Sequence, residues 1–426
     1  MVEISRHRHC MSNKIRNRFL ALVLVLAFIG VGMLYYVNWV VQKPFAIILF
    51  LTDNLNTPSL TAARIYKGGA DHRLSLETFP NLGLITTQAA DFAVSDTAAA
   101  VTAISTGQKV NNRSVGVDSA GKPLENLIDL ARSNGRLVGL VSDSAISDPT
   151  PAAFFAKLGD PLDTATIVAQ LADAPVLDVI LGGGEADFLP ELKEGRRKDG
   201  RDLMLEMRRK GYDIVRNKSE LENTPAWKAP KLLGIFASGP LAFGDEIKSA
   251  GSEPSLADMV KQAVQLLQFN PKGYLLVVDA GLVGRAASKN EGERMLRQIV
   301  ALDDAIAAAK SYAGENSLII VAGKQSVGGL TLNGYPFRND KGIAVTGINP
   351  QGVPSLTWST GPGSKPASNP APEATPAAPA EPSAVPAPSA VGVAEDGIVV
   401  SSGPGADKLG GFKDNTDIFK TIKEGL

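Results

Sequence analysis

Short, continuous apolar runs alternate with helical segments along most of this chain, and this alternation constrains its fold more than any other feature. The clearest runs are FAIILFLT at 45–52, YLLVV at 274–278 and LIIVA at 318–322. They are rich in branched or aromatic residues and show no polar alternation, which is typical of strands buried on both faces of a parallel sheet. We therefore predict an α/β fold with a doubly wound, mostly parallel sheet flanked by helices.

The other expected elements follow the same alternation. Further strands are predicted at 136–141, 176–181, 232–236 and 397–401. Helices are predicted at 124–134, 152–158, 202–210, 255–269, 291–312 and 415–423. Residues 366–390 interrupt the pattern, because they are mostly Pro, Ala and Ser and include eight prolines. This composition buries too little apolar surface to order itself, so we expect an extended, mobile loop inserted within one domain spanning 44–426.

The N-terminal segment differs from the rest of the chain. Residues 1–18 carry five Lys or Arg side chains and one acid, whereas residues 19–41 carry no charge and end in a Tyr- and Trp-containing stretch. This length spans a bilayer. We predict a basic cytoplasmic tail, a transmembrane anchor and an exported main domain, periplasmic or extracellular. A cleaved signal peptide is the alternative, but no convincing small-residue cleavage site follows the run.

The composition excludes several classes of function. The net charge is −1, so nothing indicates a nucleic-acid partner. Cys10 is the only cysteine, which excludes a disulfide framework and a thiolate metal cluster. Of the three histidines, only His72 lies beyond the N-terminal tail, so a mechanism that needs several imidazole ligands in the main domain is excluded.

An acid and a hydroxyl residue, Asp96 and Thr97, directly precede a run of alanines. We predict that Thr97 opens a helix, where its hydroxyl meets free backbone N–H groups and the positive end of the helix dipole. This geometry suits a nucleophile that carries a phosphoryl group. The alternative is an ordinary N-terminal cap on a buried helix.

Twelve stretches, in this order, resemble the alkaline phosphatases from about residue 44 to the C-terminus. They include ILFLTDN at 48–54, SDTAAAVTAISTGQKVNN at 95–112, NPKGYLLVVDAG at 270–281 and SGPGAD at 402–407. The resemblance implies a sheet flanked by helices, two zinc ions and one magnesium ion, a serine nucleophile and an arginine that clamps the phosphate. In such a site the zinc pair activates the nucleophile and stabilises the leaving oxygen.

The resemblance assigns roles to several residues of this chain. It places Asp53 at a bridging metal carboxylate and Thr97 at the nucleophile, where the hydroxyl is retained. It places Thr150 and Asp279 at the magnesium site, with Asp148 beside Thr150. Oxygen ligands suit Mg²⁺ rather than Zn²⁺, so one weak magnesium site can survive here. The alternative is that these residues remain only as capping and hydrogen-bonding groups at strand ends.

The zinc ligands of the family are missing. A zinc-binding Asp and His correspond to Gly284 and Ser288, and an Asp-His pair corresponds to Lys324-Gln325. A further His aligns near Gly363. We therefore do not expect zinc.

Two charged positions complete the prediction. The phosphate-clamping Arg corresponds to Pro161, and residues 137–195 contain no arginine that a shifted alignment could supply. Lys324 brings a positive charge close to Asp53 and Thr97, where an ammonium can stand in for a lost cation or hold phosphate or another anion. The alternative for this lysine is a solvated surface position.

These observations leave three hypotheses. The first is a membrane-anchored pseudo-enzyme with the alkaline phosphatase fold and little or no phosphomonoesterase activity. The second is a divergent hydrolase of phosphate monoesters that uses Thr97 as nucleophile, Lys324 for charge stabilisation and one Mg²⁺. The third is a structural partner protein whose working parts are the anchor and the 366–390 loop. The sequence identifies no protein partner and no substrate.

Overall fold

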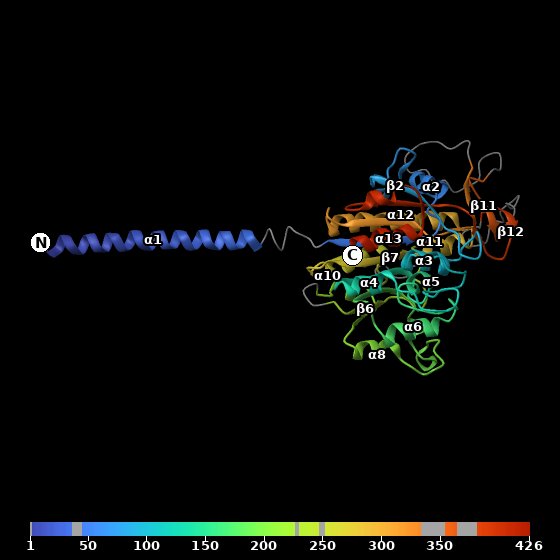
Figure 1. Cartoon of the computed structure of the whole chain (residues 1–426), viewed down its shortest axis with the longest axis horizontal. Coiled ribbons are helices and arrows are strands. Elements are labelled where there is room, and N and C mark those ends of the chain that lie inside the picture. Colours follow the sequence, from blue (N-terminus) through green and yellow to red (C-terminus); the bar gives the residue numbers. More distant parts are fainter. Residues whose placement is uncertain (1, 36–44, 226–229, 247–251, 334–353, 364–380) are drawn as a thin grey trace. The chain divides into compact units, whose positions relative to one another are not determined.

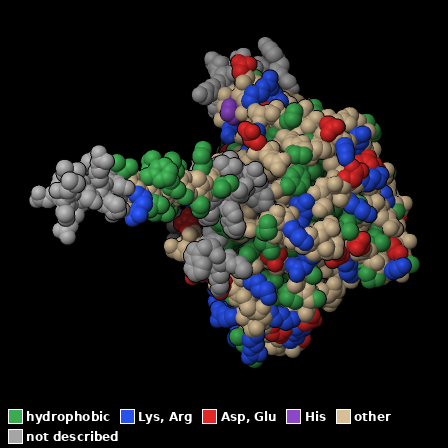
Figure 2. Space-filling model, turned by 60° about the vertical axis from the view of Figure 1, so that its left-hand side comes forward, with side chains coloured by type: hydrophobic (Ala, Val, Ile, Leu, Met, Phe, Trp, Pro, Cys, Tyr) green, Lys and Arg blue, Asp and Glu red, His purple; other side chains and the backbone are tan. Residues whose placement is uncertain are grey.

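The computed structural model describes residues 2–35, 45–225, 230–246, 252–333, 354–363 and 381–426. The chain divides into two compact units, Met1–Lys43 and Pro44–Leu426 (Figure 1). On the face drawn in Figure 2, acidic and basic side chains are interspersed over the second unit. This mixture agrees with the near-zero net charge.

The first unit contains the helix α1 (Val2–Tyr35). Its stretch Ile15–Leu34 has a mean hydropathy of 2.1, and by length and composition it can cross a membrane. A signal sequence near an N-terminus meets the same criteria. The last part of the predicted anchor, residues 36–41, lies outside the described residues.

The second unit is built on a ten-stranded sheet with the order β15-β2-β14-β8-β1-β7-β3-β4-β6-β5. Its strands are β1 (Ala46–Thr52), β2 (Asn81–Thr86), β3 (Leu137–Ala145), β4 (Val179–Gly183), β5 (Asp213–Val215), β6 (Leu232–Ile235), β7 (Tyr274–Ala280), β8 (Leu318–Gly323), β14 (Gly397–Ser402) and β15 (Gly411–Asp414). Within this sheet, β14 alone runs antiparallel to its neighbours β2 and β8. The predicted doubly wound, mostly parallel sheet is confirmed.

Helices cover both faces of the sheet (Figure 1). One face packs against α2 (Thr57–Gly68), α10 (Leu256–Leu267), α11 (Gly281–Ala287) and α12 (Gly292–Ala313). The other packs against α3 (Thr97–Thr106), α4 (Leu127–Ser133), α6 (Thr164–Asp173), α8 (Leu203–Arg209) and α13 (Thr416–Gly425). Shorter helices are α5 (Pro149–Ala152), α7 (Glu185–Phe188), α9 (Lys218–Glu222), η2 (Ser75–Thr78), η3 (Glu191–Lys193) and η4 (Ala406–Leu409).

The central strand β1 explains why its sequence lacks polar alternation. Ile48 and Phe50 belong to the core on one face of the sheet, and Ile47 and Leu49 to the core on the other. All seven residues of β1 are buried. Because β7 and β8 flank β1 in parallel, the carboxyl ends of these three strands meet at one edge of the sheet, where α/β proteins build their sites.

The predicted helix at 152–158 is wrong. The helix α5 ends at Ala152 and is followed by a turn. Two prolines in its first turn favour a helix start, because their φ angle is already helical. The chain then leaves the helix, and Leu158 forms an isolated bridge with Val115.

The loop predicted at 366–390 is partly wrong. Residues 366–380 lie outside the described part of the chain, but β12 (Ser383–Pro386) pairs in parallel with β11 (Leu356–Gly361). β11 also pairs with β10 (Leu330–Leu332), and β13 (Gly392–Val393) pairs with β9 (Ser326–Val327). Proline is tolerated in β12 because this strand lies at the edge of its sheet.

Candidate functional site

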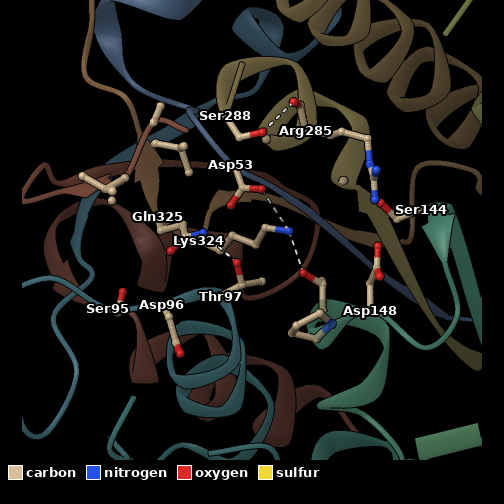
Figure 3. A pocket seen from close by; sticks show the side chains of 18 of the residues that line it. Asp53, Ser95, Asp96, Thr97, Ser144, Asp148, Arg285, Ser288, Lys324 and Gln325 are labelled. Carbon is tan, nitrogen blue, oxygen red and sulfur yellow. Dashed lines mark hydrogen bonds and ion pairs between the residues drawn. The ribbon is translucent and has the colours of Figure 1, made fainter. Parts of the chain in front are cut away.

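A cavity of about 710 Å³ opens where β1, β7 and β8 end (Figure 3). Polar and charged side chains from distant parts of the chain converge on it. All six site residues predicted from the sequence line this one cavity: Asp53, Thr97, Asp148, Thr150, Asp279 and Lys324.

The Lys324 ammonium lies at the centre of the site. Lys324 follows β8, and its side chain is only 2% exposed. Its Nζ donates to Thr150 Oγ1 at 2.6 Å and to Asp279 Oδ1 at 3.0 Å, and lies 3.5 Å from Asp53 Oδ2. The ammonium therefore sits among the three oxygen donors that the sequence offered as magnesium ligands.

Lys324 is positively charged in this environment. Burial by itself lowers the pKa of its ammonium, but Asp279 and Asp53 outweigh burial, and the pKa lies above its ordinary value. A protonated lysine cannot accept a proton from the Thr150 hydroxyl. The Lys324 ammonium thus donates a hydrogen bond to the Thr150 hydroxyl, and the two side chains do not form a nucleophile–base pair.

Asp53 is buried beside the Lys324 ammonium (Figure 3). Burial raises the pKa of its carboxyl above the ordinary value, and the neighbouring Lys324 opposes this rise. Its Oδ1 atom is buried without a hydrogen-bond partner in the described part of the structure. One oxygen of this buried carboxyl is therefore an unsatisfied acceptor.

Thr97 is the first residue of α3, whose N-cap is Asp96. The prediction that Thr97 opens this helix is confirmed. The Asp96 carboxylate accepts the backbone N–H of Ala99 at 2.8 Å. The Thr97 hydroxyl accepts a hydrogen bond from Gln325 Nε2 at 2.6 Å. An amide donor aimed at this oxygen does not remove its proton, so Gln325 positions the hydroxyl without activating it.

Asp143, which the sequence analysis did not single out, is a further buried acid near Asp279 and Lys324. It lies on β3, is 5% exposed, and accepts the backbone N–H of Leu282 at 3.0 Å. Burial, followed by the proximity of Asp279, raises the pKa of the Asp143 carboxyl to about 8. The Asp143 carboxyl therefore stays protonated at neutral pH.

This raised pKa predicts a pH dependence of stability. The folded state binds the Asp143 proton more tightly than the unfolded state, so stability is full below about pH 4 and falls as the pH rises through about 8. An asparagine at this position would keep the acceptor oxygen and never ionise. We therefore expect Asp143→Asn to raise the free energy of unfolding at pH 9 by on the order of 1–3 kcal/mol, and much less at pH 5. Urea melts at both pH values test this, with the exposed Asp71→Asn as a control that should show no difference.

Two positions that the resemblance assigns to zinc ligands have no room for a side chain. A Cβ atom on Gly284 would lie 2.0 Å from Asp53 Oδ2, and one on Gly363 would lie 1.8 Å from the carbonyl oxygen of Glu381. The Asp53 carboxylate itself fills the space at Gly284. At Gly363 the obstacle is the chain that returns from the Pro/Ala-rich segment.

The donor set does not fit a zinc pair. The other zinc-ligand positions carry Ser288, Lys324 and Gln325, which include no thiolate, imidazole or carboxylate. Across the described ranges, no group of three or more His, Cys, Asp or Glu side chains converges on one point. The oxygens of Asp53, Thr150 and Asp279 match magnesium chemistry, but the Lys324 ammonium already occupies their centre.

The phosphate-clamping arginine that the resemblance implies is also missing. Pro161 stands at the position of the clamping arginine, and the nearby Arg113 pairs with Asp160 at 2.9 Å. Two cations that the sequence analysis did not assign, Arg285 and Lys289, line the cavity instead. Arg285 lies in the last turn of α11 and Lys289 just beyond it. Two cations four residues apart were the sequence feature that could have indicated this pair.

Known proteins resemble this chain over most of its length. Residues 45–426 match the alkaline phosphatase family. The chain is 31% identical over 306 residues to alkaline phosphatase 4 of Bacillus subtilis, covering 69% of this chain and 64% of that one. It is 28% identical over 375 residues to an alkaline phosphatase of Gadus morhua, covering 76% of this chain and 78% of that one.

Solved structures show the same fold. The Thermus thermophilus alkaline phosphatase has a TM-score of 0.71 at 23% identity, covering 90% of this chain and 92% of that one. A mutant alkaline phosphatase of the Antarctic bacterium TAB5, with Mg bound in its M3 site, has a TM-score of 0.70 at 22% identity, covering 90% and 98%. From the match over 45–426 and these relatives, we conclude that the chain belongs to the alkaline phosphatase family.

Proposed function

We propose that this protein is a pseudo-enzyme of its family, which binds an oxyanion such as phosphate or a phosphate ester without metal-dependent hydrolysis. The observation that carries this proposal is the Lys324 ammonium held between Asp53, Asp279 and Thr150. It supplies a positive charge at the centre of the site without any bound metal.

This ammonium cannot reproduce two-metal chemistry. Metal ions lower the pKa of a bound water and stabilise a leaving oxygen, whereas an ammonium contributes charge and hydrogen bonds only. Gln325 holds the Thr97 hydroxyl as an acceptor, and no general base contacts that hydroxyl among the described residues. The site therefore lacks the means to hydrolyse a phosphate ester, while the exposed cations Arg285 and Lys289 that line the cavity can attract one.

The single-magnesium hydrolase is the weaker alternative. Mg²⁺ requires oxygen ligands at roughly 2.0–2.1 Å in octahedral geometry. The oxygens that could supply them already bind the Lys324 ammonium at 2.6–3.5 Å. A magnesium ion could bind only if the Lys324 side chain left the cluster, at the cost of breaking a buried ion pair.

We also propose that α1 anchors the protein in a membrane, with the N-terminus cytoplasmic and the second unit exported. The apolar stretch Ile15–Leu34 and the basic residues before it support this orientation. We expect protease added to spheroplasts, in which periplasmic and extracellular domains are both accessible, to digest the second unit and leave the anchor in the membrane. Protection of the whole chain would contradict the orientation.

Turnover of p-nitrophenyl phosphate by the full chain in detergent tests the proposed function. We expect no turnover above that of the Thr97→Ala variant in EDTA, in Mg²⁺ or in Zn²⁺ plus Mg²⁺. The variant controls for contaminating phosphatases, because it removes the only hydroxyl placed at the nucleophile position. Metal-dependent turnover that disappears in Thr97→Ala would reject the pseudo-enzyme and support the hydrolase.

A further inference from the structure

We propose that Arg285 and Lys289 form the anion clamp of this cavity, a role that moves from the segment around Pro161 to the end of α11. This inference rests on the proposed function, because it assigns the residues that bind the oxyanion. The clamp would take the phosphate group of an organic phosphate, or inorganic phosphate itself.

The charges that line the cavity leave these two cations available. The Lys324 ammonium is engaged by Asp53 and Asp279. Arg285 and Lys289 also line the cavity, are exposed, and have no ion-pair partner within 4 Å among the described residues. Two like charges four residues apart repel each other, and an anion bound between them removes that cost.

Most acids of the cavity are engaged by groups other than the clamp. Lys324 pairs with both Asp53 and Asp279 and offsets one of their two charges, and Asp96 caps α3 and accepts the backbone N–H of Arg113 at 2.7 Å. Asp148 remains as the counter-charge near Arg285, which Figure 3 shows reaching toward Ser144 and Asp148.

The two cations stand at the end of α11, Arg285 in its last turn and Lys289 just beyond it, and both line the cavity. The Asp53 carboxylate fills the space beside Gly284, so a ligand meets the ends of the two side chains rather than the helix itself. Arginine suits such a site because its planar guanidinium can donate two parallel hydrogen bonds to one phosphate.

Unsatisfied groups deeper in the cavity independently indicate a ligand. Asp53 is 6% exposed and Ser95 is 4% exposed, and both line the cavity. Asp53 Oδ1 and Ser95 Oγ are buried without a hydrogen-bond partner in the described structure. A hydroxyl-bearing organic phosphate would satisfy both, and a volume of about 710 Å³ holds such a molecule.

Isothermal titration calorimetry of the full chain in detergent, with inorganic phosphate and with glucose 6-phosphate, tests the clamp. We expect Arg285→Gln and Lys289→Gln each to weaken binding of both probes about tenfold, since each removes one charge-assisted contact. Arg285→Lys should recover only part of the loss, because lysine lacks the fork. Lys198→Gln, an exposed lysine outside the cavity, should bind as the wild type does.

Two outcomes would overturn the clamp. The first is wild-type binding that survives in the Arg285→Gln, Lys289→Gln double variant, provided its melting temperature is unchanged. The second is no binding of either probe by the wild type. Neither depends on turnover, so metal-dependent hydrolysis could reject the pseudo-enzyme while the same calorimetry supports the clamp.

Discussion

We expect Lys324→Met to lower the free energy of unfolding by ~3–5 kcal/mol, because it leaves two buried carboxyls without their counter-charge. Asp279 is 1% exposed and Asp53 is 6% exposed, so neither carboxyl can be rehydrated without opening the site. Methionine keeps most of the volume of lysine, which separates loss of charge from loss of packing. Urea unfolding of the full chain in detergent at pH 7.5 measures the difference.

A second lysine–aspartate pair provides the control for this prediction. Lys420 lies 2.7 Å from Asp417, and its side chain is 63% exposed. Exposed pairs contribute little, so Lys420→Met should change the free energy of unfolding by less than ~1 kcal/mol. Equal losses in both variants would show that Lys324 is solvated in solution and does not hold the cluster together.

The second large effect concerns metal binding. Lys324→Asp replaces the ammonium with the carboxylate that the family resemblance implies at this position. Without metal, this variant should be less stable than Lys324→Met, because a third acid joins Asp53 and Asp279. With Mg²⁺ or Mn²⁺ at about 100 times its Kd, it should recover ~2.7 kcal/mol, since a ligand that binds only the folded state stabilises it by mass action.

The wild type and the Lys324→Asn variant, whose side chain has the same shape as that of Lys324→Asp, are the controls for this prediction. The wild type should show no divalent-ion stabilisation of this size, because its own ammonium fills the site. Lys324→Asn removes the ammonium without adding a carboxylate, and it should respond to metal less than Lys324→Asp. A wild type that Mg²⁺ stabilises as strongly as the Lys324→Asp variant would contradict the account.

Much of the fold could be predicted because the central strands have a strong local signal. Every residue of β1 is buried, so its sequence is one apolar run. The polar residues at the carboxyl ends of β1, β7 and β8 mark the edge where the site forms. The helix α2 and the strand β2 were not predicted. Leu82 and Leu84 of β2 are exposed, so this strand has no continuous apolar run. Element ends also shifted, as at α5.

The members of the site and the proximity of Lys324 to Asp53 were predictable, but the hydrogen bonds of Lys324 to Thr150 and Asp279 were not. The order of motifs indicated Asp53, Thr150 and Asp279. The contacts that Lys324 makes with these three residues depend on the conformation of its long side chain, which the sequence does not specify. In the sequence, Gly284 indicates only that a zinc ligand is missing. Only the structure shows that Asp53 lies where the missing side chain would stand.

The cations of the proposed clamp were missed for a related reason. Arg285 stands directly after Gly284, where the resemblance implies a zinc ligand. The prediction therefore noted the missing ligand and did not consider the new cation beside it. The strand β12 was missed because its Pro- and Ala-rich composition signals disorder, whereas its backbone pairs with β11.

Anomalous diffraction from crystals of the protein grown with excess Zn²⁺ and Mg²⁺ tests the central claim most directly. We predict that Lys324 Nζ remains within hydrogen-bonding distance of Asp279 and Thr150 and that no zinc peak appears beside Thr97. A zinc peak between Asp53 and Thr97, with the Lys324 side chain displaced from the cluster, would contradict the claim that an ammonium has taken the place of the metal.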